Sequence, residues 1–236
     1  MFQNKMKAVT FSYDDGVTQD IRLAELFRKY DLKATFNLNS GLLGQSGCLL
    51  REGVEVRFDK IAPADVRYIY EGHEVAGHTL THPFLPAISE DQTIIHQVEE
   101  DRIRLSDLCG YEVVGFAYPG GGKNYDHRVS ELLREKTGVR YCRTIVSNAS
   151  FSLQDDLYEF QPTAYHHESI DRLFTLAEDF LRSTPTEPQL FYIWGHAFEF
   201  DIHKDWDRFE EFCRMISGHN DVFYGTNREV LLSDKA

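Results

Sequence analysis

Three histidines lie within ten residues of the segment GHEVAGHTLTHPF, which runs from Gly72 to Phe84. His78 and His82 are four residues apart, so on one helical turn both imidazoles would face the same side and could reach one metal ion. Pro83 disfavours helix at His82, so we expect the turn to end there. Two hydrogen-bonded histidines at a helix end would have the same spacing, so a metal site requires a further ligand.

Two adjacent carboxylates, Asp14 and Asp15, supply such a ligand just before Gly16. Successive side chains leaving a strand diverge, so one carboxylate can bind a metal while the other faces the substrate as a base. Gly16 would permit a tight turn with positive φ. The alternative interpretation is an acidic pair at the start of a helix, where the helix dipole favours negative charge.

Two further polar clusters could contribute to a site. In the segment YPGGGKN, which begins at Tyr118, backbone N–H groups could face a ligand, although a plain flexible turn fits equally well. Its spacing matches neither a P-loop nor the dinucleotide-binding glycine pattern, so we exclude nucleotide binding. His196 in IWGHAFEFD lies at an expected strand end, where a histidine can be structural or catalytic.

Strand-like and helical segments alternate along the chain and must position these residues. The expected strands cover residues 7–13, 33–39, 73–78, 113–118, 139–146, 158–165, 189–195 and 221–226. The expected helices cover residues 18–31 with Thr18 as N-cap, 63–72, 89–110 capped by Ser89 and ended by Gly110, 126–138, 169–184 and 206–218. Residues 41–60 are interpreted as an inserted loop or hairpin.

This alternation predicts a single α/β domain over residues 1–236. With seven or eight strands, we expect a deformed (β/α) barrel of the TIM-like kind, with a doubly wound open sheet as the alternative. The four polar clusters each follow a strand, and in parallel α/β folds the carboxyl ends of the strands lie on one face. Side chains from distant parts of the chain should therefore meet in one pocket.

Composition and charge exclude several classes of protein. The formal net charge of −13 argues against binding to nucleic acid and to anionic membrane surfaces. The four cysteines are far apart and form no C-x-x-C pair, so disulfides and cysteine-based zinc sites are not expected. The sequence contains no signal peptide or long apolar run, which predicts a cytoplasmic protein.

Together these motifs resemble those of the polysaccharide deacetylases with a NodB homology domain, in order from about Ala8 to about His196. The resemblance implies a deformed (β/α) barrel, with SYDDG as the first motif: Asp14 would be the general base and Asp15 a metal ligand. HTLTH resembles the second motif, which implies that His78 and His82 are metal ligands and that His73 is not. FAYPGG resembles the third motif and YIWGH the fifth, so His196 would be the general acid.

The sequence departs from the family pattern at the third and fourth motifs. The third motif usually carries an arginine that orients the base aspartate, but Ala117 occupies that position and Gly120 replaces the usual aromatic residue. The fourth motif, an aspartate with a tryptophan, is not clearly present. We infer that Arg143, at the end of a strand expected to neighbour residues 113–118, supplies the missing guanidinium; a surface arginine is the alternative.

With this resemblance, the residues predict a metal-dependent hydrolase that removes N- or O-acetyl groups from a sugar or a related small amide. Asp14 would accept a proton from water, a backbone N–H near Gly120 would stabilise the oxyanion, and His196 would protonate the leaving amine or alkoxide. Glu199 and Asp201 are both candidates for the carboxylate that pairs with His196. Nitrogen and oxygen ligands suit zinc best, and also cobalt, manganese, nickel or iron.

The expected substrate is a small acetylated sugar or oligosaccharide, because the polymers of the family lie outside the cytoplasm. Tyr118, Pro119, Gly120 and Trp194 are the predicted substrate-binding residues. Other aromatic residues near strand ends could stack on a sugar or pack in the core: Tyr125, Phe198 and Trp206. Alternatives are a cyclic-amide or other C–N amidohydrolase, a non-haem iron oxygenase and a non-catalytic sugar-binding domain.

Overall fold

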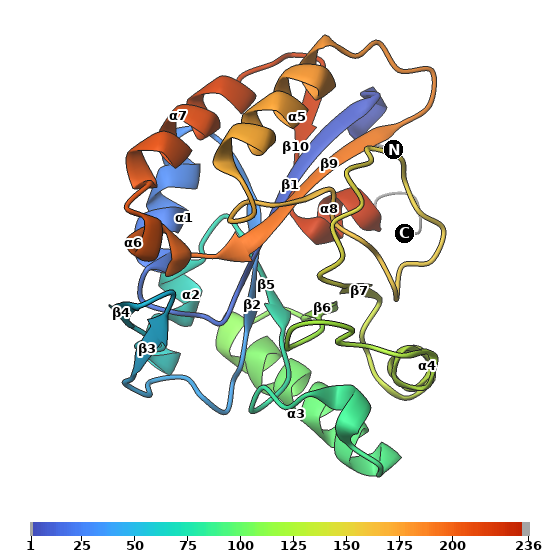
Figure 1. Cartoon of the computed structure of the whole chain (residues 1–236). Coiled ribbons are helices and arrows are strands. Elements are labelled where there is room, and N and C mark those ends of the chain that lie inside the picture. The colour runs from blue at the N-terminus through green and yellow to red at the C-terminus, as the bar shows by residue number, and fades with distance from the viewer. Residues whose placement is uncertain (1, 233–236) are drawn as a thin grey trace.

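The computed structural model describes residues 2–232, which are built around one parallel sheet of eight strands (Figure 1). Its strands are β1 (Lys7–Asp14), β2 (Ala34–Leu38), β5 (Glu74–Gly77), β6 (Gly115–Ala117), β7 (Tyr141–Arg143), β8 (Ala164–Tyr165), β9 (Gln189–His196) and β10 (Val222–Tyr224). The helices are α1 (Asp20–Lys29), α2 (Val66–Ile69), α3 (Asp91–Cys109), α4 (His127–Lys136), α5 (Ile170–Arg182), α6 (Glu199–His203), α7 (Trp206–Ile216) and α8 (Asn227–Leu231). Three 3₁₀ turns complete the elements: Phe2–Asn4, Pro63–Asp65 and Leu85–Ala87.

The strands follow one another around a deformed barrel. Neighbours lie in the order β7-β6-β5-β2-β1-β9-β8, and β10 lies beside the first residues of β1. The segment before β8 contacts the other end of this row: Cys142 of β7 donates to the carbonyl of Leu157 at 2.7 Å, and Phe160 donates back to Cys142 at 3.1 Å. Sequence order is thus kept around the ring, whereas a doubly wound sheet would reverse it. The predicted deformed barrel is confirmed.

β1 lies at the centre of the sheet and is buried along its whole length. Its sequence, KAVTFSY, alternates apolar residues with a threonine and a serine, whose buried hydroxyls are hydrogen-bonded. Lys7, at the start of the strand, also has its charge paired: its ammonium donates to the carbonyls of Leu181 and Ser183 at the end of α5 and lies 2.8 Å from Asp221. Cations at a helix C-terminus are favourable there.

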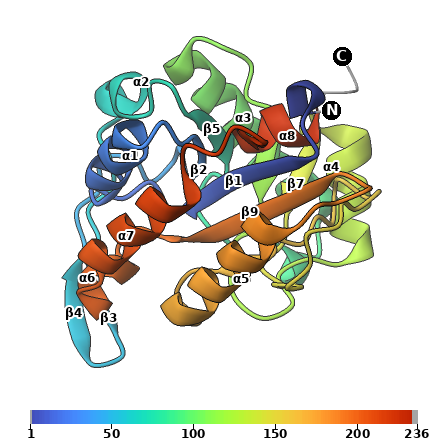
Figure 2. The ribbon, with the colours of Figure 1, turned by 90° about the horizontal axis from the view of Figure 1, so that it is seen from above.

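The helices lie outside the strands, as the view from above shows (Figure 2). Gly110 ends α3 in the left-handed conformation with φ 75°, as predicted, because a glycine adopts that conformation without a Cβ clash. Ser169 accepts a hydrogen bond from the N–H of Arg172 and so caps α5. Among the described residues, none of the helices combines the length and the apolar character needed to cross a bilayer.

Several predicted boundaries are wrong for identifiable reasons. The expected strand over residues 158–165 is reduced to β8 and one bridge at Phe160, because Pro162 has no N–H to donate to a ladder. Thr18 does not cap α1, because the helix begins at Asp20 and Gln19 occupies the N-cap position without a side-chain hydrogen bond. α3 begins at Asp91 without a side-chain cap from Ser89. The short helices α6 and α8 were not expected.

The insertion between β2 and α2 is a hairpin, one of the two forms predicted for residues 41–60. Its antiparallel strands are β3 (Cys48–Arg51) and β4 (Val54–Arg57), joined at Glu52 and Gly53, which both have positive φ. Lys60, just beyond β4, forms an antiparallel bridge with Val17. The hairpin is therefore held against the carboxyl end of β1, where Asp14 and Asp15 lie.

Candidate active site

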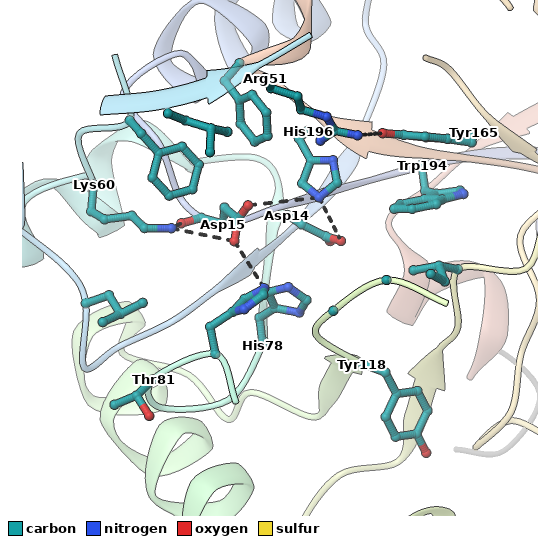
Figure 3. Close-up of a pocket in the computed structure, with 18 residues that line it drawn as sticks. Asp14, Asp15, Arg51, Lys60, His78, Thr81, Tyr118, Tyr165, Trp194 and His196 are labelled. Carbon is teal, nitrogen blue, oxygen red and sulfur yellow. Dashed lines mark hydrogen bonds and ion pairs between the residues drawn. The ribbon is translucent and has the colours of Figure 1, made fainter. Parts of the chain in front are cut away.

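The carboxyl ends of four strands meet at one cavity of about 720 Å³ (Figure 3). In the ladders, Asp14 at the end of β1 is paired with His196 of β9 on one side and with Asn37 of β2 on the other. His78 follows β5 and Tyr118 follows β6 directly. The strand ends therefore bring the four predicted polar clusters together in one place.

Asp15, His78 and His82 form a set of three potential metal ligands. Each offers one ligand atom, and these atoms all lie within 4.8 Å of one another. Nε2 of His82 lies 3.7 Å from Oδ1 of Asp15, and the two imidazole rings are 4.9 Å apart between centroids. Because bonds to zinc are about 2 Å long, small side-chain adjustments suffice for these atoms to reach one ion. The donor set fits a divalent metal.

His78 is oriented for ligation by its own surroundings. Its Nδ1 lies 2.7 Å from the carbonyl oxygen of Ala117, a contact that a neutral ring makes by donating from Nδ1. That tautomer leaves Nε2 with a free lone pair, the usual arrangement of a metal-binding histidine. Burial lowers the pKa of His78 to about 4, so the ring is neutral at physiological pH. Asp101 accepts from the His78 N–H at 3.0 Å and fixes the backbone.

The segment that joins the two histidines is a loop, so the predicted helical turn is wrong. Thr79 and His82 have φ values of 68° and 59°, outside the helical region. The loop is closed by hydrogen bonds instead: His82 donates to Oγ1 of Thr79 at 3.0 Å, and Leu80 donates to the carbonyl of Gln97 at 2.8 Å. Asn39 donates to the carbonyls of His78 and Thr79. Tertiary contacts, rather than helical periodicity, bring the imidazoles together.

Asp15 is buried and remains ionised. Its backbone has φ 84°, which turns its carboxylate away from the line of β1. Burial alone would raise its pKa, but Lys60 and then His196 outweigh that effect and lower the pKa below its usual value. The Lys60 ammonium donates to the backbone carbonyl of Asp15 at 2.6 Å and lies 3.6 Å from Oδ1. Lys60 was not predicted, because the sequence gives no sign that the inserted hairpin reaches β1.

Asp14 is held by two donors. Nη2 of Arg143 lies 2.5 Å from both carboxylate oxygens, and the Asn37 amide donates to Oδ1 at 2.7 Å. Asp14 and Arg143 are both almost completely buried. Ala117 of β6 and Arg143 of β7 are directly paired in the sheet. The guanidinium thus comes from β7, the neighbour of β6, on which the motif arginine would lie at position 117. The predicted contact between Arg143 and Asp14 is present.

Trp194 lines the cavity but is also tightly packed. The Arg143 guanidinium lies 4.6 Å from the centroid of its ring, and Tyr165 stacks on the ring at 4.3 Å with an angle of 17°. Only 5% of Trp194 is exposed, which leaves little ring surface for a sugar. Trp194 therefore supports Arg143 and forms part of the wall, and its role in substrate binding stays a prediction.

His196 is paired with Glu199. Nδ1 of His196 lies 3.1 Å from Oε1 of Glu199, and Nε2 lies 4.0 Å from Oδ2 of both Asp14 and Asp15. Burial by itself lowers the pKa of His196, but Glu199 and then the two aspartates outweigh it and raise the pKa to about 9. Asp201, the other candidate partner, instead accepts hydrogen bonds from Gln19 and Trp206.

Glu199 is the centre of a buried polar network that the sequence did not reveal. Nη1 of Arg51 lies 3.0 Å from Oε1 of Glu199, Nε2 of His166 lies 3.1 Å from Oε2, and the Tyr165 hydroxyl donates to Oε1. Burial would raise the pKa of Glu199, but His196 and His166 outweigh this and hold it well below its usual range. Arg51 comes from the hairpin, so no local motif connects it with the site.

The glycine-rich loop contributes backbone rather than side chains. Gly120 and Gly121 line the cavity, and Gly120 has φ 91° with space for a Cβ limited by the Phe84 ring at 3.1 Å. The Tyr118 ring points away from the cavity, and its hydroxyl donates to the carbonyl of Tyr158 at 2.8 Å (Figure 3). Pro119 is not among the lining residues.

The rest of the cavity wall is largely apolar. Much of it comes from the insertion, and the other apolar residues come from distant loops. The apolar lining residues, apart from Trp194 and Tyr118, are Leu42, Leu49, Phe58, Ile145, Tyr165 and Phe198. Of the other aromatic residues considered for stacking on a sugar or for core packing, Phe198 lines the cavity, whereas Tyr125 and Trp206 do not.

Comparison with known proteins supports the reading of these motifs. The family model described as polysaccharide deacetylase matches residues 3–142, which include Asp14, Asp15, His78 and His82. No curated protein matches the chain significantly. Many solved structures do match, and three of them illustrate the range.

The Xyl-CE4 domain of a multidomain xylanase from the hindgut metagenome of Trinervitermes trinervoides is 16% identical, with a TM-score of 0.57, and the alignment covers 97% of this chain and 91% of that domain. A mutant of BA3943 from Bacillus anthracis, a CE4 family pseudoenzyme with restored enzymatic activity, is 18% identical with a TM-score of 0.55 over 97% and 68% of the two chains. The deacetylase PplD of Streptococcus pyogenes is 18% identical with a TM-score of 0.50, over 64% of this chain and 61% of that one. At these identities the likeness shows a shared fold.

Proposed function

Because this chain belongs to the polysaccharide deacetylase family, we propose that it is a metal-dependent hydrolase that removes acetyl groups from an acetylated sugar. The observation that carries the proposal is the division of labour between adjacent carboxylates. Asp15 converges with His78 and His82, while Asp14 is turned to Arg143 and Asn37. This is the arrangement required when one carboxylate binds a metal and the other acts as a base.

The metal, when bound by Asp15, His78 and His82, would supply a Lewis acid that lowers the pKa of water and polarises the acetyl carbonyl. Zinc suits these nitrogen and oxygen ligands, as do cobalt, manganese, nickel and iron. The protein prepares the ligands for this role: His78 is neutral and oriented by Ala117, and Asp15 is ionised. No thiolate is part of the set.

Asp14 accepts the proton of the attacking water in this mechanism. Arg143 and Asn37 hold its carboxylate, so little reorientation is needed when the proton moves. The water oxygen forms a bond to the acetyl carbon, and a backbone N–H of the turn at Gly120 and Gly121 stabilises the oxyanion. Collapse breaks the C–N or C–O bond and releases acetate.

His196 donates the proton that the leaving amine or alkoxide needs. Its pKa of about 9 keeps it protonated at neutral pH, and Glu199 holds Nδ1 so that Nε2 faces the two aspartates. Protons balance, because one passes from water to Asp14 and one passes from His196 to the leaving group. Glu199 is a positioning residue in this scheme, since it acts through His196.

We propose a small acetylated sugar or oligosaccharide as the substrate, in keeping with the sequence-based prediction. A cavity of about 720 Å³ is of the size that binds small ligands, and apolar side chains form most of its wall. The zinc identity, the cytoplasmic location and this preference for a small substrate stay predictions.

A non-catalytic sugar-binding domain is the second candidate, because one structurally similar protein, BA3943, is a pseudoenzyme and the third motif lacks its arginine. The contact between Arg143 and Asp14 favours catalysis instead.

Acetate release from a panel of acetylated sugars, with and without added metal, distinguishes the enzyme from the sugar-binding domain. An enzyme releases acetate only with metal, and Asp14→Asn abolishes the release. Sugar binding without acetate release from any member, at any metal concentration, would favour the binding domain. Turnover of a cyclic amide or consumption of oxygen would favour the amidohydrolase or the iron oxygenase.

A further inference from the structure

A second group of metal-ligand side chains lies at the turn of the hairpin, outside the site already described. It consists of Glu52, His167 and His203, whose potential ligand atoms all lie within 4.8 Å of one another. Glu52 lies in the turn between β3 and β4, His167 follows β8, and His203 is the last residue of α6. Three segments separated by more than thirty residues in the sequence therefore bring two imidazoles and a carboxylate together.

The contacts within this group are close. Nε2 of His167 lies 3.0 Å from Oε1 of Glu52, and Nε2 of His203 lies 3.6 Å from Oε2 of the same carboxylate. The two imidazole rings are 4.3 Å apart between centroids, at an angle of 63°. Both rings thus direct Nε2 towards one carboxylate, as two imidazoles and a carboxylate around a single ion do.

Geometry singles out this group. Nitrogen atoms of two rings that pack at 4.3 Å point to the same carboxylate, and all three side chains come from different segments. A divalent cation placed between them would be shared by the two imidazole nitrogens and a carboxylate oxygen. Nitrogen and oxygen ligands of this kind suit zinc, cobalt, nickel or copper.

We propose that Glu52, His167 and His203 bind a second divalent metal ion, of the zinc class, that joins the hairpin to α6 and to the loop after β8. Water completes its coordination, since the three protein ligands leave open positions on the side of the solvent. Binding does not depend on the proposed function, because none of the three residues belongs to the Asp15, His78 and His82 set.

The position of this ion gives it a structural consequence for the cavity. Arg51 precedes Glu52 directly, and its guanidinium contacts Glu199 and the Tyr165 hydroxyl. A metal at Glu52 therefore fixes the end of β3 where Arg51 meets the carboxylate that holds His196. An effect of this clamp on turnover would rest on the proposed function, whereas the clamp itself can be measured without activity.

The first test is zinc stoichiometry, measured by elemental analysis after equilibration with zinc and removal of excess ion. The proposal expects two zinc ions per chain for the unaltered protein and one for each of Glu52→Gln, His167→Gln and His203→Gln. Asp15→Asn should also bind one, and Asp15→Asn combined with His203→Gln none. The matched control is His96→Gln, at an exposed position of α3, which should keep two.

The second test is hydrogen exchange of the amides of residues 48–57 in the Asp15→Asn protein, with and without zinc. Zinc should slow exchange there, and the added His203→Gln should remove the effect. A zinc content that is the same in the unaltered protein and in all three variants of this group would overturn the proposal, whatever the Asp15 site binds. A protein that binds two ions as expected but releases no acetate contradicts only the proposed function.

Discussion

Two neighbouring aspartates have different partners in this protein. Asp14 forms an ion pair with the Arg143 guanidinium, whereas Asp15 lies among Lys60 and the two histidines of HTLTH. Both carboxylates still face His196, whose Nε2 lies 4.0 Å from Oδ2 of each. Because their other partners differ, each side chain can be tested alone.

Asp14→Asn should lower kcat by at least about 100-fold, the contribution of a general base, and leave the metal content of the Asp15 site unchanged. Asp15→Asn should lose that metal. Turnover with acetylated substrate and elemental analysis check both variants. Equal loss of metal from the two proteins would show that the base has been misassigned.

Glu199→Gln should shift the alkaline limb of the pH–rate profile to lower pH. His196 acts as an acid, so activity falls as pH rises through its pKa of about 9, and Glu199 is the group that raises this pKa most. Removing that carboxylate should lower the limb by about one pH unit or more. Asp201→Asn is the matched control, since Asp201 bonds to Gln19 and Trp206, and its profile should not move.

Among the single residues of the site, those that belong to a local motif were predicted from the sequence, and those brought in by tertiary contacts were missed. The two aspartates, the histidine pair and His196 could be named from local patterns, and Arg143 from the expected neighbourhood of two strands. Lys60 and Arg51 could not, because both lie in an insertion whose path is set by packing.

At the scale of elements, the register between β6 and β7 decides where the guanidinium lies. Ala117 and Arg143 are partners in this ladder, so their side chains leave the sheet side by side. The small side chain of Ala117 leaves room beside the arginine, which is fully buried and packed on Trp194.

Arg143→Ala should lower kcat by about 100-fold, because an unrestrained base is poorly oriented, and it should retain the metal. It should also cost about 3–5 kcal/mol of stability, since Asp14 loses its buried partner. The double variant Ala117→Arg with Arg143→Ala returns the arginine to the adjacent strand and should recover part of kcat. Steady-state kinetics on the folded, metal-loaded proteins measure this. No recovery would show that the guanidinium must leave from β7.

Element boundaries were predictable where a local signal dominates. Gly110 ends α3 as its conformational freedom requires, and the inserted hairpin was recognised as one of two possibilities. The shape of the loop from His78 to His82 could not be predicted, because it depends on hydrogen bonds to Gln97 and Asn39, which lie elsewhere in the chain.

For the molecule as a whole, the alternation of strands and helices was enough to predict a barrel. The sequence did not reveal how the ring closes, because residues 157–160 contact β7 without forming a regular strand.

One carboxyl group of the core makes the stability of the whole molecule depend on pH. Asp20 is completely buried and accepts a hydrogen bond from Tyr70 at 2.7 Å.

Burial raises the pKa of Asp20 to about 8 despite the hydrogen bond from Tyr70. An unfolded aspartate has a pKa near 3.9, so between about pH 4 and pH 8 the folded state binds one more proton than the unfolded state. The stabilisation is present at low pH and is lost as pH rises through this window. Relative to Asp20→Asn, the unaltered protein should lose up to about 1.4 kcal/mol of unfolding free energy per pH unit.

Urea unfolding at pH 5 and pH 8 measures this difference, with Asp65→Asn at an exposed position as control. Between pH 5 and pH 8, the unfolding free energy of Asp20→Asn should rise relative to that of the unaltered protein. The unfolding free energy of Asp65→Asn should change with pH as that of the unaltered protein does. Parallel pH profiles for Asp20→Asn and the unaltered protein would contradict a protonated Asp20 in the folded state.

The pairing of Ala117 with Arg143 has a consequence for reading the evolutionary record. If either of two adjacent strands can deliver the guanidinium, homologous sequences should carry arginine at one of the two positions and a small residue at the other. Selection would then act on the pair of positions, and each position considered alone would vary among homologues. Homologues that lack the motif arginine divide into two groups on this view: those with a compensating exchange on β7, which kept the reaction, and those without one, which lost it.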